Sequence, residues 1–404
     1  MRVLRLSAKA TPAEWGRTHG EMFAKEIREL VDLRMEISLD RGLFQSADQA
    51  LKVAKFHLPV LLQFDRGIHA ELMGIATGSG CLPSEILLLN HYNDLWMIDP
   101  ENPEKAHAGR QEFAEREVRD HSGIPQPQAT GLAPDAGPIE LGPPEEDCSS
   151  VMVRTPEGAC LAQTWDAHAT VQPYTMMLHC PSENTDDPYG VKGAWLFSVT
   201  GCLGLMGLND AGVAVGTNSM VAKKGRIGVI WPALIRKVLQ ERTAKAGRDI
   251  MLNVPTGAGR HFLLADRSLA YGVETTSGLR RVVFGGPGRR YVHTNHALAA
   301  ELQDEILVSP DSSSRQRYDY LFDQTKNFPV RNAVDLWERM GSHDGMPGSI
   351  CHHLPTDENP HTVVTCGGML ALMDQRKLWI AEGCLNGTQP TVYDFEEDGA
   401  KSDG

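Results

Sequence analysis

Apolar residues recur at helical spacing through the first hundred of the 404 residues. Intervals of three and four residues place them on one face of a helix, and they include Phe23, Ile27, Leu30 and Val31. The pattern predicts one long helix over residues 14–39 and another over residues 50–77. We expect the second helix to break at Pro59, because proline lacks the backbone N–H that a helix interior uses. A third helix should follow Pro83, with Ser84 as its N-cap.

Beyond residue 148 the pattern changes to short apolar runs separated by Gly, Asn or Asp, which is typical of β-strands and turns. Helical spacing interrupts these runs at residues 229–246, 313–326 and 330–340. The predicted strands span residues 149–155, 159–165, 175–179, 194–199, 213–218, 261–265, 269–275, 290–293, 362–365, 368–373 and 378–382. Strands and helices grouped in this way predict an α+β layered fold.

Between these regions, residues 100–147 show no apolar periodicity and are rich in Gly, Pro, Glu and Gln. This composition favours a mobile surface linker, with a long ordered loop as the alternative. We therefore divide the chain into a helical N-terminal part (1–99), a Pro/Gly-rich linker (100–147) and a strand-rich catalytic part (148–404).

Composition narrows the function classes. The net charge of −13 argues against a nucleic-acid-binding protein, which ordinarily presents a basic face. No apolar run has the length of a membrane span, and the N-terminus lacks the apolar core of a secretory signal. The eight cysteines are scattered and form no Cys-x-x-Cys pair, which favours reduced thiols in a cytoplasmic protein.

The junction of linker and strands, EEDCSSVMVRTPEGACLAQTWDA, places a cysteine directly before a predicted hairpin. With Pro156 and Glu157 at the centre of the turn, Cys148 faces Trp165 on the second strand. A three-residue loop would place Cys148 opposite Asp166 instead. In either register the thiol and the carboxylate lie at the same end of the hairpin.

A cysteine at this point needs a base before it can act as a nucleophile. Asp166 alone would raise the thiol pKa, because two negative charges repel each other. Cleavage of the bond between Asp147 and Cys148 would instead give Cys148 a free α-amine, which titrates close to neutral pH. That amine could take the thiol proton directly or through a water, and Asp166 could hold its ammonium form.

Several segments resemble one family in their order and spacing. The junction DCSS and the following QTWDA are similar to the nucleophile region of the N-terminal-nucleophile (Ntn) hydrolases, closest to the peptidase C45 or acyl-CoA:6-aminopenicillanic acid acyltransferase family. Later motifs of that family resemble GLMGLNDAGVAVGTNSM, YVHTNHAL, SSSRQRYDYL and GSICHH, and GRTHGEMFAKEI fits near the N-terminus. The resemblance extends over most of the chain outside the linker.

This resemblance implies a four-layer αββα sandwich with a helical N-terminal segment, and self-cleavage between Asp147 and Cys148. The implied catalytic residues are Cys148 as nucleophile, Asp166 as its polar partner, Asn295 as oxyanion donor and Arg315 as a support for the nucleophile end. Candidate pocket residues in the same motifs are Ser149, Trp165, Asn218 and His296. The implied reaction is hydrolysis or transfer of the acyl group of a small amide through a Cys148 thioester, without a cofactor.

Departures from the family keep an alternative open. Asp147 stands where the family carries glycine, and Ala167 replaces an aromatic residue after Asp166. The alternative is an unprocessed, non-catalytic Ntn-fold protein that binds a ligand with the Asp147–Cys148 bond intact. Because the glycosylasparaginases, another Ntn group, cleave after Asp, Asp147 does not forbid cleavage.

Histidines at positions 293 and 296 and the segment Cys351–His353 raise a metal site as a further alternative. Neighbouring residues on a strand point to opposite faces, so Cys351 and His352 would not converge easily. Zinc-type pairs of Cys or His are absent elsewhere, and we therefore expect no metal. We expect the two processed chains to stay associated and to have no nucleic-acid or membrane partner. Whether the protein forms a homo-oligomer stays an open question.

Overall fold

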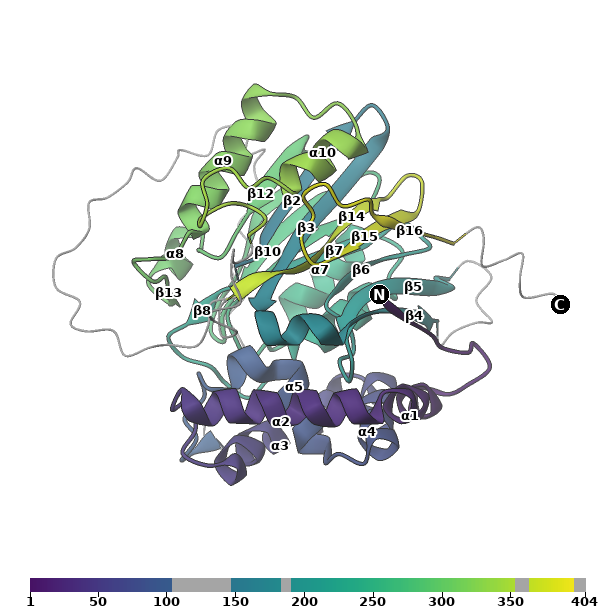
Figure 1. The fold of residues 1–404 in the computed structure, drawn as a ribbon, viewed down its shortest axis with the longest axis vertical. Coiled ribbons are helices and arrows are strands. Elements are labelled where there is room, and N and C mark those ends of the chain that lie inside the picture. The colour runs from purple at the N-terminus through teal and green to yellow at the C-terminus, as the bar shows by residue number, and fades with distance from the viewer. Residues whose placement is uncertain (104–146, 183–189, 353–362, 396–404) are drawn as a thin grey trace.

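Two β-sheets are stacked face to face, and helices cover the outer side of each sheet (Figure 1). The computed structural model describes residues 1–103, 147–182, 190–352 and 363–395. Most of the predicted linker therefore lies outside the described residues. The layers run helix, sheet, sheet, helix, which confirms the predicted α+β fold of αββα type.

The larger sheet contains eight strands in the order β1-β4-β5-β6-β7-β9-β10-β11. Their bounds are β1 (Arg2–Arg5), β4 (Thr175–Pro181), β5 (Gly193–Val199), β6 (Met206–Asn209), β7 (Ala214–Ser219), β9 (Arg260–Ala265), β10 (Ala270–Thr275) and β11 (Arg280–Gly286). β1 pairs with β4 in parallel, whereas the other neighbours are antiparallel. The N-terminal part of the chain thus supplies an edge strand to a sheet built by the C-terminal part.

The smaller sheet contains six strands in the order β12-β2-β3-β14-β15-β16. Their bounds are β12 (Arg290–His293), β2 (Ser149–Thr155), β3 (Gly158–His168), β14 (Val363–Leu372), β15 (Lys377–Glu382) and β16 (Thr391–Asp394). Thr155 pairs with Gly158 across the β2–β3 hairpin. Of the two registers left open by the sequence, the structure has the one with the two-residue turn, which places Cys148 opposite Trp165.

Helices α9 (Ser314–Asn327) and α10 (Ala333–Met340) cover the smaller sheet. Helix α7 (Ala244–Asn253) packs on β9 and β10 of the larger sheet, next to α6 (Trp231–Val238). The remaining short elements are η2 (Ala169–Tyr174), α8 (Ala300–Gln303) and a two-stranded pair of β8 (Val221–Ala222) with β13 (Ile306–Leu307).

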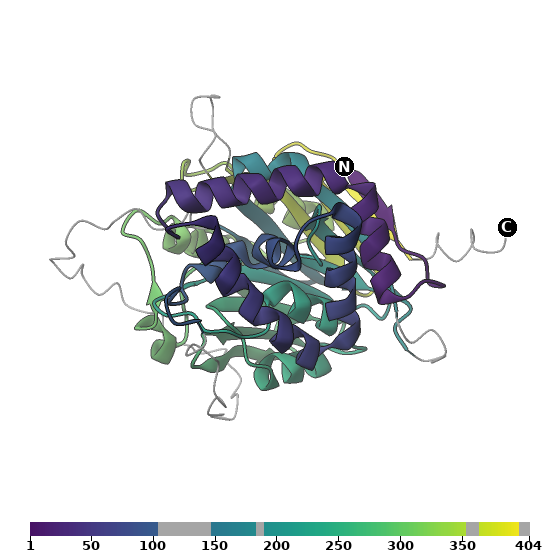
Figure 2. The same ribbon diagram turned by 90° about the horizontal axis from the view of Figure 1, so that it is seen from below.

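Five N-terminal helices form a further layer below the larger sheet (Figures 1 and 2). They are α1 (Pro12–Met22), α2 (Ala24–Asp40), α3 (Ala47–Phe64), α4 (Arg66–Ser79) and α5 (Pro83–Leu95). A buried ion pair joins Arg236 on α6 to Glu71 on α4, with 2.8 Å between nitrogen and oxygen. The Gly201 N–H donates to His19 Nε2 at 2.9 Å. Burial lowers the pKa of His19 to about 3, so this ring stays a neutral acceptor.

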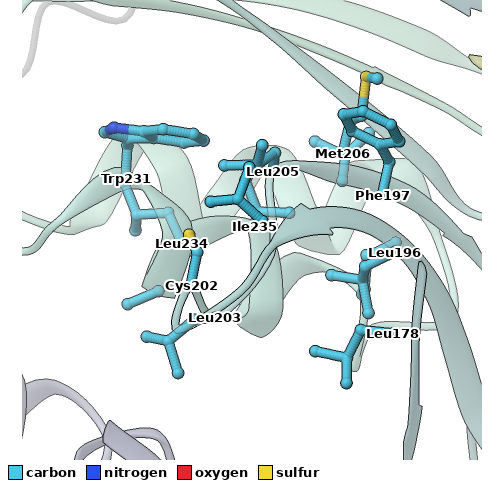
Figure 3. Packing of buried hydrophobic residues seen from close by; sticks show 14 of the residues in the cluster. Leu178, Leu196, Phe197, Cys202, Leu203, Leu205, Met206, Trp231, Leu234 and Ile235 are labelled. Atoms are coloured by element: carbon cyan, nitrogen blue, oxygen red, sulfur yellow. The ribbon is translucent and has the colours of Figure 1, made fainter. Parts of the chain in front are cut away.

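The largest hydrophobic cluster of the described residues lies on both faces of the larger sheet, against the helices on one side and the smaller sheet on the other (Figure 3). Leu178 from β4 and Leu196 from β5 belong to it with Leu234 and Ile235 from α6, and Phe197, the next residue on β5, packs against Trp165 of the smaller sheet. The five side chains from β4, β5 and α6 are fully buried. Burial of each such side chain contributes about 1.5–3 kcal/mol, which fixes α6 against the sheet.

Several predicted element boundaries were wrong. The long helix over residues 14–39 is divided at Phe23 into α1 and α2. α3 continues through Pro59 and ends at Phe64, because the break comes at Asp65, whose side chain accepts from the Ile68 N–H and caps α4. The N-cap of α5 is Leu82 rather than Ser84, and the Glu85 carboxylate accepts from the Leu82 N–H at 2.7 Å.

The C-terminal region also departs from the prediction in places. Residues 229–246 form parts of two helices, α6 and α7, because Thr243 begins a new helix as its N-cap. The two strands predicted over 362–365 and 368–373 are one strand, β14, with a register shift between Thr365 and Gly367. Strands β1, β6, β8, β11, β13 and β16 were not predicted. In the described part of the chain, no single helix is long and apolar enough to cross a membrane, although α4 and α5, bent by 115°, pass that test together.

Helices α1 and α4 approach closely because each presents two glycines to the other. A Cβ on Gly16 would lie 1.9 Å from Glu71 O, and one on Gly74 would lie 2.3 Å from Ala13 O. Both contacts are with backbone and are far inside van der Waals distance. Gly20 on α1 and Gly78 on α4 meet similar obstacles.

We predict that Gly16→Ala destabilises the chain by about 1–3 kcal/mol, because the added methyl group separates α1 from α4. An exposed glycine in a helix would respond with the opposite sign, since alanine has the higher helix propensity. Urea unfolding measures the change. Thr18→Ala, on the exposed side of α1, is the control and should change the free energy of unfolding by less than about 0.5 kcal/mol. A Gly16→Ala chain at least as stable as the parent would contradict the close contact.

Candidate active site

Cys148 lies one residue before β2 and is 1% exposed. The pairing of Ser149 with Thr164 places it at the end of the hairpin that carries Asp166. Cys148 Sγ lies 4.0 Å from the backbone oxygen of Asp166. The structure therefore places Cys148 and Asp166 side by side at the end of the hairpin, with the thiol next to the Asp166 backbone.

Arg317 on α9 is fully buried and holds this end of the hairpin in place. Its Nη1 donates to Cys148 O at 3.0 Å and to Ser149 Oγ at 2.8 Å. Its Nη2 donates to Asp147 Oδ1 and to Asn295 Oδ1, both at 2.9 Å. Its Nε donates to Ser313 Oγ at 2.9 Å. All five N–H donors of the guanidinium thus have acceptors.

Arg315, the arginine expected at this position, is exposed, and Arg317 takes its place. The inward face of α9 is set by Ser314, Arg317 and Leu321, which are all buried. A residue one position after Ser314 is turned by about 100° around the helix, away from that face. The prediction is therefore corrected from Arg315 to Arg317.

Asp166 is a fully buried carboxyl group. Its Oδ2 accepts from Thr164 Oγ1 at 3.4 Å and lies 3.9 Å from His352 Nδ1, and Oδ1 has no hydrogen-bond partner among the residues that the structure describes. Burial raises the pKa of Asp166 well above its ordinary value, although the positive charge of Arg317 opposes the shift. This carboxyl group is thus poised to accept a cationic or hydrogen-bond-donating neighbour.

His352 was considered in the sequence only as part of a metal site, and it lies instead beside Asp166. Two backbone contacts with β14 hold it, because the His352 N–H donates to Thr365 Oγ1 and His352 O accepts from the Thr365 N–H. Thr365 pairs with Asp166 directly before the register shift in β14. The bulge thus sits next to the candidate site, a frequent place for such irregularities. His353 lies outside the described residues.

Asn218 on β7 reaches the site from the larger sheet. Its Nδ2 donates to Cys148 O at 2.9 Å. Its Oδ1 accepts from Ser150 Oγ at 2.7 Å and lies 2.8 Å from His261 Nδ1. Ser150 and His261 were not predicted, since their role depends on strands brought together by the sandwich. The Cys148 carbonyl oxygen is consequently fixed from two sides, by Asn218 and Arg317.

Asn295 follows β12 and is held between two elements. Its backbone N–H donates to Ser314 Oγ on α9 at 2.8 Å, and its Nδ2 donates to Ser219 O at 3.0 Å. Together with the Arg317 contact, these bonds orient Asn295 next to the guanidinium that also binds the Cys148 carbonyl.

The other candidate pocket residues differ in position. Ser149 contacts Arg317, as described, and Trp165 is buried with its ring edge-on to Phe197 at a centroid distance of 5.6 Å. His296 is buried against the start of α9, where its Nδ1 lies 2.9 Å from Ser314 Oγ, the same oxygen that accepts from the Asn295 N–H. Burial lowers the pKa of His296 to about 3.

A sequence profile of the acyl-coenzyme A:6-aminopenicillanic acid acyl-transferase family matches residues 153–380, more than half of the chain. The chain belongs to this family. It is therefore an Ntn-type enzyme of the acyltransferase and amide-hydrolase class. The matched range contains Asp166, Asn218, Asn295 and Arg317 and begins five residues after Cys148.

One relative in this acyltransferase family is the 40 kDa form of acyl-coenzyme A:6-aminopenicillanic-acid-acyltransferase from Emericella nidulans. It is 26% identical over 359 residues, which cover 86% of this chain and 84% of the relative. Among solved structures, penicillin V acylase from Agrobacterium tumefaciens aligns with a TM-score of 0.42 and 16% identity, over 62% of this chain and 86% of that chain. Conjugated bile acid hydrolase from Clostridium perfringens gives a TM-score of 0.44 and 12% identity, over 62% and 93%. The layers described above rest on the strands and helices of this chain and not on these two structural alignments.

We predict that Asp166→Asn raises the free energy of unfolding by roughly 1–3 kcal/mol near neutral pH when Cys148 is also replaced by Ala. Because burial raises the pKa of Asp166 in the folded chain, the folded state binds this proton more tightly than the unfolded state does, and above the ordinary carboxyl range this difference opposes folding. The gain should shrink as the pH falls into the ordinary carboxyl range, where both states are protonated. Thermal and urea unfolding across this pH range measure it.

Asp32→Asn, at an exposed position of α2, is the matched control and should leave the pH profile unchanged. An Asp166→Asn chain that is less stable at every pH would show that the carboxyl group is compensated in the fold.

We predict that Arg317→Lys lowers the free energy of unfolding by about 2 kcal/mol or more, although the charge is kept. A lysine ammonium cannot span acceptors that a planar guanidinium reaches from three nitrogens, and each buried acceptor left without a donor costs about 1–3 kcal/mol. Arg315→Lys is the matched control two residues away and should stay within about 0.5 kcal/mol of the parent. Equal effects of the two replacements in urea unfolding would contradict the assignment of Arg317.

Proposed function

We propose that the chain cuts its own Asp147–Cys148 bond and then uses Cys148 as the nucleophile of a small-molecule amidase or acyltransferase. The observation that carries the proposal is the buried Asp166 carboxyl at the end of the hairpin that carries Cys148, whose Oδ1 has no hydrogen-bond partner within residues 1–103, 147–182, 190–352 and 363–395. Buried polar atoms are ordinarily paired. The ammonium group of a newly formed N-terminus at Cys148 would supply the missing donor and charge.

The first reaction is an acyl shift within the chain. Sγ of Cys148 attacks the carbonyl carbon of Asp147, the bond from that carbon to the Cys148 nitrogen breaks, and the nitrogen takes up a proton to become an amine. Water then hydrolyses the thioester and leaves a carboxylate on Asp147. Arg317 supports this step, because it holds the Asp147 side chain and the Cys148 carbonyl on either side of the reacting bond.

The second reaction uses the same thiol on a substrate amide. The α-amine of Cys148 accepts the thiol proton while Sγ attacks the acyl carbon. The amine then returns this proton to the leaving nitrogen, so that an amine departs and a thioester remains on Cys148. Water, or a second amine, resolves the thioester and regenerates the thiol. Hydrolysis is the simpler outcome, because acyl transfer requires a site from which water is excluded.

Asn295 is the proposed side-chain donor to the oxyanion of each tetrahedral intermediate. Arg317, Ser314 and Ser219 hold its side chain and backbone in place beside the Cys148 carbonyl group. Removal of one oxyanion donor costs about 3 kcal/mol in comparable enzymes. The substrate class is a small N-acyl compound, in keeping with the relative that is named as an acyltransferase of 6-aminopenicillanic acid.

We predict that the purified wild-type chain separates under denaturing conditions into residues 1–147 and 148–404, and that Cys148→Ala stays whole. Intact mass spectrometry after prolonged incubation measures both species. Cys81→Ala, which replaces a buried cysteine in the N-terminal part, is the control and should be cut like the wild type. Amine release from a panel of N-acyl amides should accompany the cut chain only.

A wild-type chain that stays whole and releases no amine would contradict the proposal and favour the unprocessed binding protein. Cleavage at the same bond in Cys148→Ala would contradict the role of the thiol. Asp147→Gly adds a further comparison, because it restores the residue that the resembling family carries at this point.

A further inference from the structure

A second group of reactive side chains lies apart from Cys148, where two loops at the edge of the smaller sheet meet. Cys351 Sγ and Cys384 Sγ are 3.5 Å apart, and His343 Nε2 is 3.2 Å from Cys384 Sγ. The three potential ligand atoms all lie within 4.8 Å of one another. Cys351 is buried, and His343 and Cys384 are half-buried. The mechanism proposed above uses none of them.

The two loops are held together by contacts outside this group. The Cys351 N–H donates to Ser342 O at 3.1 Å. Asn386 Nδ2 donates to Gly341 O at 2.9 Å, which links the loop after α10 to the turn after β15. The backbone therefore presents the three side chains to one point without depending on a bond between the sulfurs.

The distances fit a tetrahedral metal better than a disulfide. Zinc with bonds of about 2.3 Å to sulfur and 2.0–2.1 Å to nitrogen places two sulfurs about 3.8 Å apart and sulfur and nitrogen about 3.6 Å apart. The observed separations are shorter by a few tenths of an ångström. A disulfide would require the two sulfurs to approach to about 2.05 Å.

We propose that His343, Cys351 and Cys384 bind one zinc ion, with water as the fourth ligand. Two thiolates balance the two positive charges of the ion, so the occupied site is neutral with a neutral imidazole, which suits its half-buried position. The two thiol protons leave to solvent on binding. The Leu385 N–H, 3.4 Å from Cys351 Sγ, supplies the kind of outer hydrogen bond that stabilises a coordinated thiolate.

The site would act on the loop that leads to the active site. His352, beside Asp166, is the next residue after Cys351. A zinc ion that joins Cys351 to the turn after β15 would hold this loop, and with it His352, in one position. The site is thus structural, and its occupancy is independent of whether the Asp147–Cys148 bond is cut.

Cobalt substitution tests the proposal on the full-length chain. The chain carries Cys148→Ala, so that the nucleophile cannot bind metal, and it is reduced and dialysed against a chelator. Addition of Co²⁺ should produce a sulfur-to-cobalt charge-transfer band and the visible bands of tetrahedral cobalt, saturating at about one equivalent per chain. Zinc should displace the cobalt and raise the thermal midpoint, because it binds the folded state.

Cys351→Ser and Cys384→Ser should each abolish the charge-transfer spectrum or weaken zinc binding by more than the roughly 10–100-fold that loss of an outer partner costs. His343→Ala, at a half-buried loop position, should weaken zinc binding and change the visible bands. This variant replaces the cysteine variants in the test if one of them does not fold. Cys81→Ser is the matched control and should bind like the parent.

Three outcomes would overturn the proposal. One is a reduced chain that takes up no cobalt or zinc. Another is a charge-transfer band that survives in the Cys351→Ser/Cys384→Ser double variant. The third is a Cys351–Cys384 disulfide found by mass spectrometry in chain purified without reductant, with no metal uptake after reduction. Self-cleavage is measured on the wild-type chain by intact mass, whereas metal binding is measured on the Cys148→Ala chain, so failure of one proposal does not affect the other.

Discussion

One buried side chain, the guanidinium of Arg317, organises the Cys148 end of the β2–β3 hairpin. It brings five N–H donors into the interior, and the fold must therefore supply acceptors to all of them. The acceptors come from the junction before β2, from Asn295 after β12 and from the start of α9. Segments far apart in the sequence are thus fixed relative to one another by the need to solvate one charge.

The two carboxyl groups near Cys148, those of Asp147 and Asp166, differ in their environment because they lie differently relative to Arg317. Asp147 forms an ion pair with Arg317, with 2.9 Å between nitrogen and oxygen. Asp166 is fully buried, and its pKa is raised because desolvation outweighs the charge of Arg317. Strongly shifted pKa values of this kind are frequent at functional sites. Before the cut, Asp147 pairs with Arg317. After the cut, Asp166 would pair with the new α-ammonium group of Cys148, so that one ion pair would be added where another already exists.

The sequence supported some of these conclusions and not others. The β2–β3 hairpin and the end of it that carries Cys148 and Asp166 could be predicted because the turn signal is local, whereas the choice between the two registers needed the structure. The assignment of Arg315 followed the motif and missed the helical phase that turns Arg317 inward. His261, His343 and Cys384 had no local signal, since they converge with their neighbours only through tertiary contacts, and Cys351 was considered only together with the adjacent histidines. The helix break predicted at Pro59 was wrong, because the prediction did not consider Asp65, whose side chain caps the next helix and sets the boundary.

The parallel pairing of β1 with β4 has a consequence for the folding history of the molecule. In a chain cut after Asp147, β1 and the five N-terminal helices belong to one polypeptide and their partners to another. Before the cut, the linker keeps the two parts at high effective concentration, and folding is unimolecular. After the cut, reassembly depends on encounter and dilution. The mature protein would then persist because it unfolds slowly, and its lifetime would be governed by a rate rather than by an equilibrium.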